Sequence, residues 1–371
     1  MNACLGAGIL AFPLAYHRAG GVLVSMILQT IFLIPACIAM IYLGYASDIR
    51  KTDSYERTLE VVAGRPGKIF FSIILFLYTT GTCITFLIII GDLLDRVLAT
   101  LICLPMSIPR DISFLRHASA LGVVCVFYLV GLIFSLYFTQ LPPPGPIKTR
   151  PDHWTDVFLV LPTICFGYQC HICTVPVYAS MKARPSLKHF AAASMLAIIG
   201  AMAVYSVVGI CGYWSFGALV QADITTNYPP SIPVLIGIAL MEKQERYGTV
   251  LSLVLTLVCY TCNLLLAVFV SDISVVIGWL GALAAIFAYA GPGFIMFRLC
   301  VMERSGQLQL FLSDEEEECL INSSDDEDSL TAPVLGIGYY TRLILSISLI
   351  VVGSFIFGLT VSISAIDSFA K

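Results

Sequence analysis

Two hydrophobic segments contain glycine and proline near the middle, where these residues are expected to break a helix. The first reads NACLGAGILAFP (residues 2–13), and the second reads LPTICFGYQCHICTVP (residues 161–176). Glycine and proline interrupt helices, so nearby backbone N–H and C=O groups lose their intrahelical partners. Free N–H groups at the start of a half-helix attract a carboxylate, and free carbonyl oxygens attract an ammonium group or a sodium ion. Together the segments have the chemistry to bind a small zwitterion.

Amide and imidazole side chains lie close to these interruptions. Asn2 precedes the first glycine turn, and Gln169 and His171 follow Gly167. Polar groups inside a membrane are costly and often mark a functional site. His171 is a candidate proton-sensitive group, because histidine titrates near pH 6.5, although a packing role fits it equally well. Asn263, in another apolar run, fits a hydrogen bond between helices.

The composition indicates which elements must hold these groups. Of the 371 residues, 58% are hydrophobic and only 12% are charged. A soluble domain needs a polar surface that this chain cannot supply. The composition therefore excludes a soluble enzyme, a nucleic-acid-binding protein and a disordered scaffold, and it favours an all-α integral membrane protein.

Eight apolar runs are long enough to cross a bilayer, which takes about 20 helical residues. Helix is the expected state, because lipid leaves backbone groups no water to bind. The eight runs are residues 22–46, 69–91, 118–138, 157–181, 190–222, 249–271, 273–297 and 343–366. Three shorter runs, residues 1–16, 97–109 and 229–241, cannot cross unaided.

The basic residues give a topology if all eleven runs cross. With the N-terminus in the cytosol, fifteen of the 20 Lys and Arg residues fall inside, which agrees with the positive-inside rule. The others are Arg18, Arg96, Lys148, Arg150 and Lys371. We therefore expect eleven spans by descent, with spans 1, 4 and 8 truncated. A spliced or incompletely predicted gene product would have this appearance.

The interrupted segments begin two successive blocks of five spans, 1–5 and 6–10. Broken helices at matching positions of two halves are typical of inverted-repeat transporters. Either break alone could instead serve close helix packing or a kink. We expect a transporter core over residues 1–300, with repeats at about 1–138 and 157–300. An acidic cytosolic loop (301–332) and a last transmembrane helix with the C-terminus (333–371) would follow.

The acidic loop contains the clusters DEEEE and DDED. A charge run of this kind is usually a solvated segment. Within it, Glu316, Leu320 and Ile321 form an acidic residue followed by Leu-Ile, which resembles a sorting signal for endosomes and lysosomes that clathrin adaptors bind. Ser313 and Ser324 precede acidic residues and fit phosphorylation by an acid-directed kinase.

The chain resembles the sodium-coupled neutral amino acid transporters of the amino acid/auxin permease group, and within them a lysosomal branch that carries glutamine and asparagine. The resemblance covers most of the chain except the short runs and the acidic loop. The motifs are NACLGAG at 2–8, GTCITFLIIIGD at 81–92, LPMSIPRDI at 104–112, LPTICFGYQCH at 161–171, GICGYWSFGA at 209–218 and GSFIFG at 353–358.

The resemblance implies a LeuT-like fold of two inverted five-helix repeats plus one helix. It implies sodium binding at Asn2 and carboxylate binding by the backbone of Gly6, Ala7 and Gly8. The amino end of the substrate and the gate of the transport pathway would be lined by Phe166, Gly167 and Tyr168. No organic cofactor is implied, and a sodium ion or a proton would be the coupling ion.

The chain departs from the family pattern at two places that bear on function. Ala11 stands where the family usually has Asn, and span 8 is reduced to SIPVLIGIALM. We expect a secondary active transporter of glutamine and asparagine in a lysosomal membrane, or alternatively the plasma membrane. The alternatives are a membrane amino acid sensor and an inactive or incomplete transporter. An enzyme is not expected, because the sequence contains no HExxH motif or paired catalytic aspartates.

Overall fold

The computed structural model describes residues 4–93, 113–139, 145–181, 187–228, 263, 273–305 and 338–369. These residues form helices joined by short connections, with no β-strand among them. Six helical segments are long and apolar enough to cross a membrane, in agreement with an integral membrane protein. They are Val22–Arg50, Tyr55–Ile89, Trp154–Ser180, Leu187–Leu219, Ile273–Arg304 and Tyr339–Ile363.

The long helices are α2 (Val22–Arg50), α3 (Tyr55–Leu93), α5 (Ser113–Thr139), α8 (Leu187–Phe216) and α14 (Tyr339–Phe369). The shorter helices are α1 (Phe12–Arg18), α6 (Leu161–Gly167), α7 (His171–Ser180), α11 (Ile273–Ala285) and α12 (Gly291–Arg304). The 3₁₀ turns are η1 (Ala7–Ala11), η2 (Trp154–Val160), η3 (Gly217–Leu219) and η4 (Ile224–Asn227). A π-helical turn, η6 (Ile286–Ala290), joins α11 to α12.

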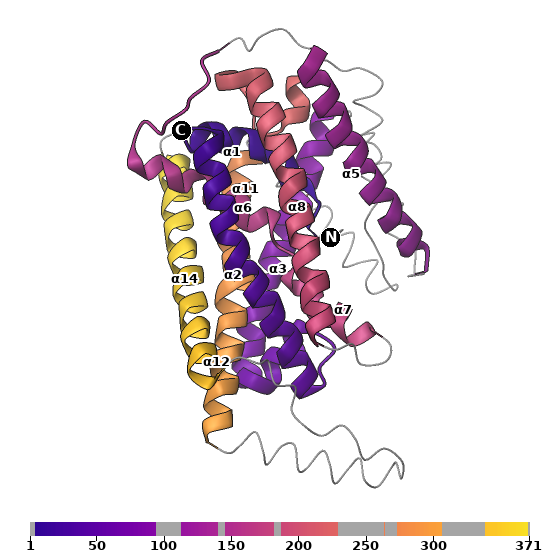
Figure 1. The fold of residues 1–371 in the computed structure, drawn as a ribbon, viewed down its shortest axis with the longest axis vertical. Coiled ribbons are helices and arrows are strands. Elements are labelled where there is room, and N and C mark those ends of the chain that lie inside the picture. The colour runs from indigo at the N-terminus through magenta and orange to yellow at the C-terminus, as the bar shows by residue number, and fades with distance from the viewer. Residues whose placement is uncertain are drawn as a thin grey trace.

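The short helices α1, α6 and α11 lie inside the bundle, and long helices surround them (Figure 1). Helix α1 packs against α8, α6 packs against α11, and α2 packs against both α7 and α8. Helix α14 runs along one edge beside α11 and α12, and α5 lies at the opposite edge against α8. The segments that were predicted to be interrupted therefore occupy the centre of the bundle.

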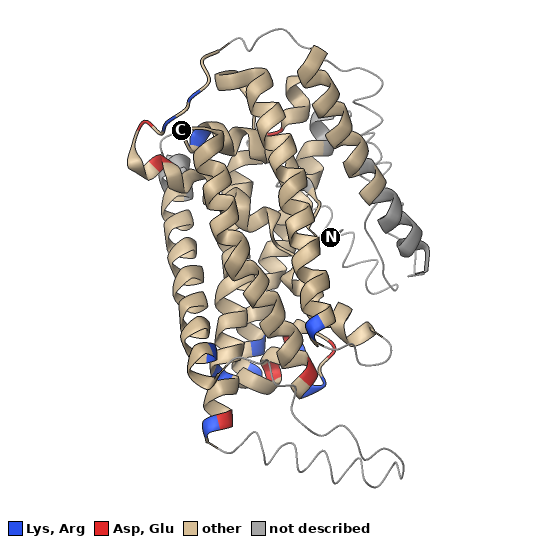
Figure 2. Ribbon diagram, in the orientation of Figure 1, with Lys and Arg blue, Asp and Glu red and all other residues tan. Residues whose placement is uncertain are grey.

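Charged residues gather at the two ends of the bundle (Figure 2). We define the basic end by Arg50, Arg57, Arg298 and Arg342, and the opposite end by the turn that follows α1. At the basic end, Arg342 of α14 donates to Glu303 of α12 over 2.9 Å and to the hydroxyl of Tyr45 of α2 over 3.1 Å. This cluster fastens three helices where they leave the apolar layer.

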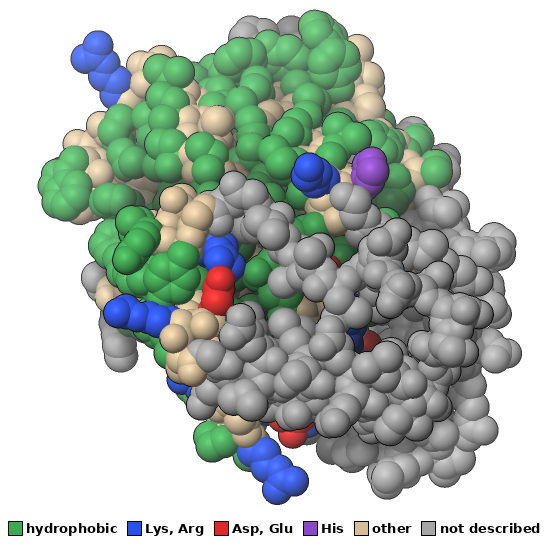
Figure 3. Space-filling model, turned by 60° about the horizontal axis from the view of Figure 1, so that its bottom comes forward, with side chains coloured by type: hydrophobic (Ala, Val, Ile, Leu, Met, Phe, Trp, Pro, Cys, Tyr) green, Lys and Arg blue, Asp and Glu red, His purple; other side chains and the backbone are tan. Residues whose placement is uncertain are grey.

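The outer faces of the helices are apolar. Leu196 of α8 is 72% exposed, and Phe76 of α3 and Ile344 of α14 are also strongly exposed. Figure 3 shows hydrophobic side chains over the flank of the bundle, with charged side chains near the basic end. Exposed leucine, isoleucine and phenylalanine on this scale suit contact with lipid chains and not with water.

Helix α3 begins at Tyr55, well before the predicted start at residue 69. The earlier turns carry charges, so a search for charge-free runs excluded them. Gly64 has φ 73° and ψ −178°, which sets these turns off as a separate helix at the basic end. The runs 97–109, 229–241 and nearly all of 249–271 lie outside the described residues, so the eleven-span count stays a prediction.

The turn between α1 and α2 requires glycine twice. Gly20 and Gly21 have φ of 90° and 121°, which side chains rarely adopt. A Cβ on Gly20 would lie 2.3 Å from Pro151, and one on Gly21 would lie 2.5 Å from the Lys148 carbonyl oxygen. These glycines let the segment before η2 cross close over the end of α1.

Candidate functional site

The first predicted interruption lies between Cys4 and Phe12. Gly6 has extended backbone (φ −133°, ψ −159°), and the 3₁₀ turn η1 follows it. Helix α1 starts at Phe12, with Pro13 in its first turn, where the missing N–H of proline costs nothing. The described residues give the N–H groups of Ala7 and Gly8 no backbone partner outside η1, whereas that of Ile9 donates to the Gly6 carbonyl over 3.1 Å.

The second predicted interruption separates α6 from α7. Helix α6 ends at Gly167, Tyr168 to Cys170 are not helical, and α7 restarts at His171. A helix of ten residues that starts inside the bundle directs its first N–H groups, which have no intrahelical partner, toward the break. The structure thus agrees with the prediction that both segments are broken.

The two breaks are in contact. A Cβ on Gly8 would lie 3.0 Å from the Phe166 ring and 3.4 Å from the Gly167 Cα atom. A Cβ on Gly167 would in turn lie 3.0 Å from the Phe12 ring. Glycine at both positions lets η1 and the end of α6 approach closely, as two halves of one site must.

Tyr205 of α8 links the breaks through its hydroxyl group. The hydroxyl lies 2.8 Å from the Gly167 carbonyl oxygen and also contacts that of Cys4. Its ring stacks on Phe12 with centroids 4.6 Å apart and planes 14° apart. The sequence carries no signal for its role, because it is one aromatic residue in a long apolar helix.

Helix α2 supplies a further polar contact. The Tyr16 hydroxyl donates to the Gln29 side-chain oxygen over 2.8 Å, and the Tyr168 hydroxyl donates to the Gln29 carbonyl over 3.3 Å. His171 is fully buried, and its Nε2 atom lies 3.1 Å from the Ala36 carbonyl oxygen. A hydrogen bond to a carbonyl requires a proton on Nε2, which assigns the tautomer of the neutral ring.

Two side chains in the second break, those of Cys170 and Gln169, differ in their hydrogen bonding. The Cys170 thiol donates to the Met40 sulfur over 3.6 Å, and it also interacts with the Cys4 thiol of the first break. Gln169 is buried, yet neither polar atom of its side chain has a hydrogen-bond partner. The break therefore contains an unsatisfied amide beside groups that are paired.

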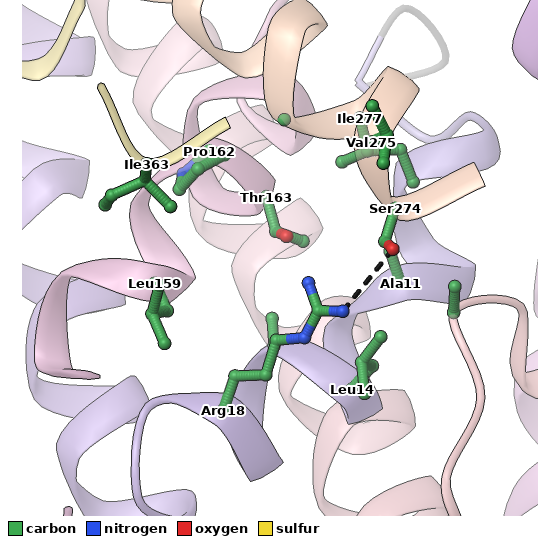
Figure 4. A pocket seen from close by; sticks show the side chains of 13 residues that line it. Ala11, Leu14, Arg18, Leu159, Pro162, Thr163, Ser274, Val275, Ile277 and Ile363 are labelled. Carbon is green, nitrogen blue, oxygen red and sulfur yellow. Dashed lines mark hydrogen bonds between the residues drawn. The ribbon is translucent and has the colours of Figure 1, made fainter. Parts of the chain in front are cut away.

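A cavity of about 40 Å³ lies between α1, α6 and α11 on the side of the opposite end. Ala11, Pro162 and Thr163 line it, and Figure 4 shows Arg18 pointing into it toward Ser274. The Arg18 guanidinium donates to the Ser274 hydroxyl over 3.4 Å. One water needs about 10–15 Å³, so the cavity holds a few waters and not an amino acid.

The opposite end also carries titratable side chains. His17 is partly buried, and its ring lies 5.7 Å from that of Tyr213. Burial and the nearby Lys148 and Arg18 lower the pKa of His17. Lys148 forms an ion pair with Asp152, which raises the pKa of Lys148 and lowers that of Asp152.

The structure brings together most of the predicted site residues. Gly6 precedes η1, Ala7 and Gly8 lie in its first turn, and Phe166, Gly167 and Tyr168 lie at the end of α6. Asn2 and the sorting residues Glu316, Leu320 and Ile321 lie outside the described residues. Within the described part of the chain, no cluster of three or more His, Cys, Asp or Glu side chains suits a metal ion.

Comparison with known proteins adds the family. The family model described as transmembrane amino acid transporter protein matches residues 1–241. Sodium-coupled neutral amino acid transporter 7 of Homo sapiens is 33% identical, over 97% of this chain and 85% of its own. The Danio rerio protein of that name is 32% identical, over 82% and 78%.

Solute carrier family 38 member 8 of Homo sapiens is 29% identical, over 81% of this chain and 83% of its own. The expectation of a transporter and not an enzyme is confirmed by these relatives. With its two broken central helices and this extent of similarity, the chain belongs to the transmembrane amino acid transporter family, in the group of sodium-coupled neutral amino acid transporters.

Proposed function

We propose that this chain is a secondary active transporter of neutral amino acids, with glutamine and asparagine as substrates. The proposal rests on the contact between the two breaks, where Gly8 meets Phe166 and Gly167 in the centre of the bundle. Irregular backbone at membrane depth is tolerated where protein buries it, and transporters use it to bind substrate and ion. Alternating access would move one group of helices against the other around this site.

The carboxylate of the substrate would bind the backbone near Gly6, Ala7 and Gly8. The N–H groups of Ala7 and Gly8 have no backbone partner outside η1 among the described residues, whereas that of Gly6 donates to the Cys4 carbonyl over 3.0 Å. A partial positive charge at the start of a half-helix favours an anion there. Phe166, Gly167 and Tyr168 would line the amino end. Asn2 would contribute a sodium ligand, and the names of the relatives, sodium-coupled transporters, support sodium over a proton as the coupling ion.

The architecture that we propose is the LeuT-like one, with inverted repeats at about 1–138 and 157–300. The position of α6 and α7 at the start of the second half supports it. His171 would be the proton-sensitive group if a proton takes part. The lysosomal membrane is the proposed location, with clathrin adaptors binding Glu316, Leu320 and Ile321, and the plasma membrane is the alternative.

Uptake into proteoliposomes tests the proposal. The full chain is reconstituted, and labelled glutamine uptake is measured with an inward sodium gradient, with a pH gradient and with neither. We expect uptake to follow the sodium gradient. Unlabelled glutamine should compete, whereas its decarboxylated analogue should not, because it lacks the carboxylate. Equal competition by the two would refute the zwitterion site, and glutamine binding without flux would identify a sensor.

A further inference from the structure

Gln169 has an unusual position for an amide side chain. It lies between α6 and α7, in the non-helical segment of the second break. Its side chain is only 7% exposed, and neither Oε1 nor Nε2 has a hydrogen-bond partner in the described part of the chain. Nearly all buried polar groups in folded proteins are hydrogen-bonded, so such an amide calls for an explanation.

Gln29 of α2 shows how this bundle treats a structural amide. It is fully buried, its Oε1 accepts from Tyr16 over 2.8 Å, and its Nε2 lies 3.5 Å from the Met202 carbonyl oxygen. Both ends of Gln29 are therefore satisfied by protein groups. The same bundle leaves both ends of Gln169 open, although an apolar side chain of equal size would avoid the desolvation cost.

The neighbours of Gln169 are engaged elsewhere. The Tyr168 hydroxyl donates to the Gln29 carbonyl oxygen, and the Cys170 thiol donates to the Met40 sulfur over 3.6 Å and interacts with the Cys4 thiol. Among residues 168–170, Gln169 is thus the side chain whose polar atoms are both left without a partner, although the Nδ1 atom of the following His171 is also unpaired. The Gln169 amide has one acceptor and two donors, which is the set that a second primary amide complements in both directions.

We propose that Gln169 determines specificity by pairing with the side-chain carboxamide of the transported amino acid. The pairing places the amide of the substrate at the second break, while the backbone near Gly8 holds its carboxylate. A site built to pair with a polar group discriminates strongly against analogues without it, because its own polar atoms then stay unpaired. This inference rests on the proposed transport function, and it names the group of the substrate that the site recognises.

Substitution of Gln169 in the full chain tests the pairing. Initial uptake of glutamine and of alanine into proteoliposomes is compared for wild type, Gln169→Met and Gln169→Asn. Methionine keeps the length of the side chain and removes the amide. We expect the ratio of glutamine to alanine uptake efficiency to fall about 10- to 100-fold in Gln169→Met, with alanine uptake retained. Gln169→Asn keeps the amide on a shorter side chain, so its uptake ratio should lie between those of wild type and Gln169→Met.

Thermal unfolding without substrate separates this role from a structural one. Gln169→Met removes an unsatisfied buried amide, so its Tm should equal or exceed that of wild type. Gln29→Met removes a satisfied amide and should lower Tm without changing the uptake ratio. An unchanged uptake ratio in Gln169→Met would overturn the inference. If the Tm of this variant also fell as much as that of Gln29→Met, the role of Gln169 would be structural.

The two proposals can fail separately. If wild type takes up both amino acids and Gln169→Met leaves their ratio unchanged, only the pairing fails. If wild type takes up neither, transport fails, and stabilisation of wild type and Gln169→Met by added glutamine or alanine then tests the pairing as binding. Selective loss of the glutamine effect in the variant would support the pairing, and equal effects of both ligands on both proteins would overturn it.

Discussion

The hydroxyl group of Tyr205 lies 2.8 Å from the carbonyl oxygen of Gly167, the last residue of α6. The same hydroxyl contacts the carbonyl oxygen of Cys4, ahead of η1. A hydroxyl has one hydrogen, so the two carbonyls share it or exchange it. One side chain of α8 therefore couples the positions of both breaks, and a movement of either half-helix must disturb this contact.

Tyr205→Phe should reduce transport and stability together. The substitution removes the hydroxyl from the buried Gly167 carbonyl, whereas the Cys4 carbonyl still accepts from the Gly6 N–H over 3.0 Å. It keeps the ring that stacks on Phe12. The loss of such a contact costs about 1–2 kcal/mol of unfolding free energy. We expect the initial rate of glutamine uptake to fall roughly five- to tenfold, because the relative placement of the breaks loosens. Uptake rates and Tm in detergent measure both effects.

Tyr213→Phe provides a matched control on the same helix. Its hydroxyl accepts from the Lys148 N–H over 2.7 Å at the opposite end, away from the breaks. A comparable loss of Tm with little change in uptake is the expected result. If both variants reduced uptake equally, the effect of Tyr205→Phe would be attributable to stability alone.

Gly281→Ala should prevent the close packing of α11 on α6. A Cβ at this position would lie 2.3 Å from the carbonyl oxygen of Pro162, and backbone cannot move aside as a side chain can. Overpacking of this kind costs about 1–3 kcal/mol or more. Gly131→Ala of α5, where nothing lies within 4 Å of the added carbon, should leave Tm unchanged or slightly raised. Equal Tm values for the two variants would contradict this packing.

The sequence predicted where the central helices break but not how the breaks are joined. Gly6, Gly8 and Gly167 stand out in a short stretch of sequence, so a local pattern is sufficient to find them, although the close approach that Gly8 and Gly167 permit appears only in the structure. The contacts of Tyr205 with Gly167 and of Cys4 with Cys170 join residues far apart in the chain. They depend on how α8 and the half-helices pack, which no local pattern encodes.

The boundaries of the spans show the same limit. The run 118–138 lies within α5, because its ends coincide with a change in polarity. Helix α3 starts earlier than its apolar run, because its first turns lie at the basic end, where charges are tolerated. Hydropathy measures burial in lipid and not helix length, so it cannot find helical turns outside the lipid.

Oxidation should cross-link Cys4 to Cys170. The two thiols interact across the breaks, and both are free cysteines. A two-electron oxidant such as hydrogen peroxide would take two electrons and two protons from the thiols and form one disulfide. We expect a Cys4–Cys170 linked peptide by mass spectrometry and a loss of glutamine uptake that a reductant reverses.

Single variants define the cross-link. Cys4→Ser and Cys170→Ser should each abolish the linked peptide and the sensitivity of uptake to oxidant. Cys173→Ser, at an exposed position of α7, should change neither. A cross-link between Cys170 and another cysteine in wild type would show that the two breaks are arranged differently.

His17 should make the stability of the opposite end fall at acidic pH. Burial together with Lys148 and Arg18 lowers its pKa below the usual 6.5, so the folded state binds the proton less readily than the unfolded state. Stability is then lost as pH falls below 6.5, and the loss stops growing below the depressed pKa. We expect Tm to drop less in His17→Gln than in wild type between about pH 7.5 and about pH 5.5.

His153→Gln, at an exposed position near the same end, serves as the control and should follow wild type. Parallel Tm curves for wild type and His17→Gln would contradict the assignment, since the carboxylates that titrate below this range are common to both.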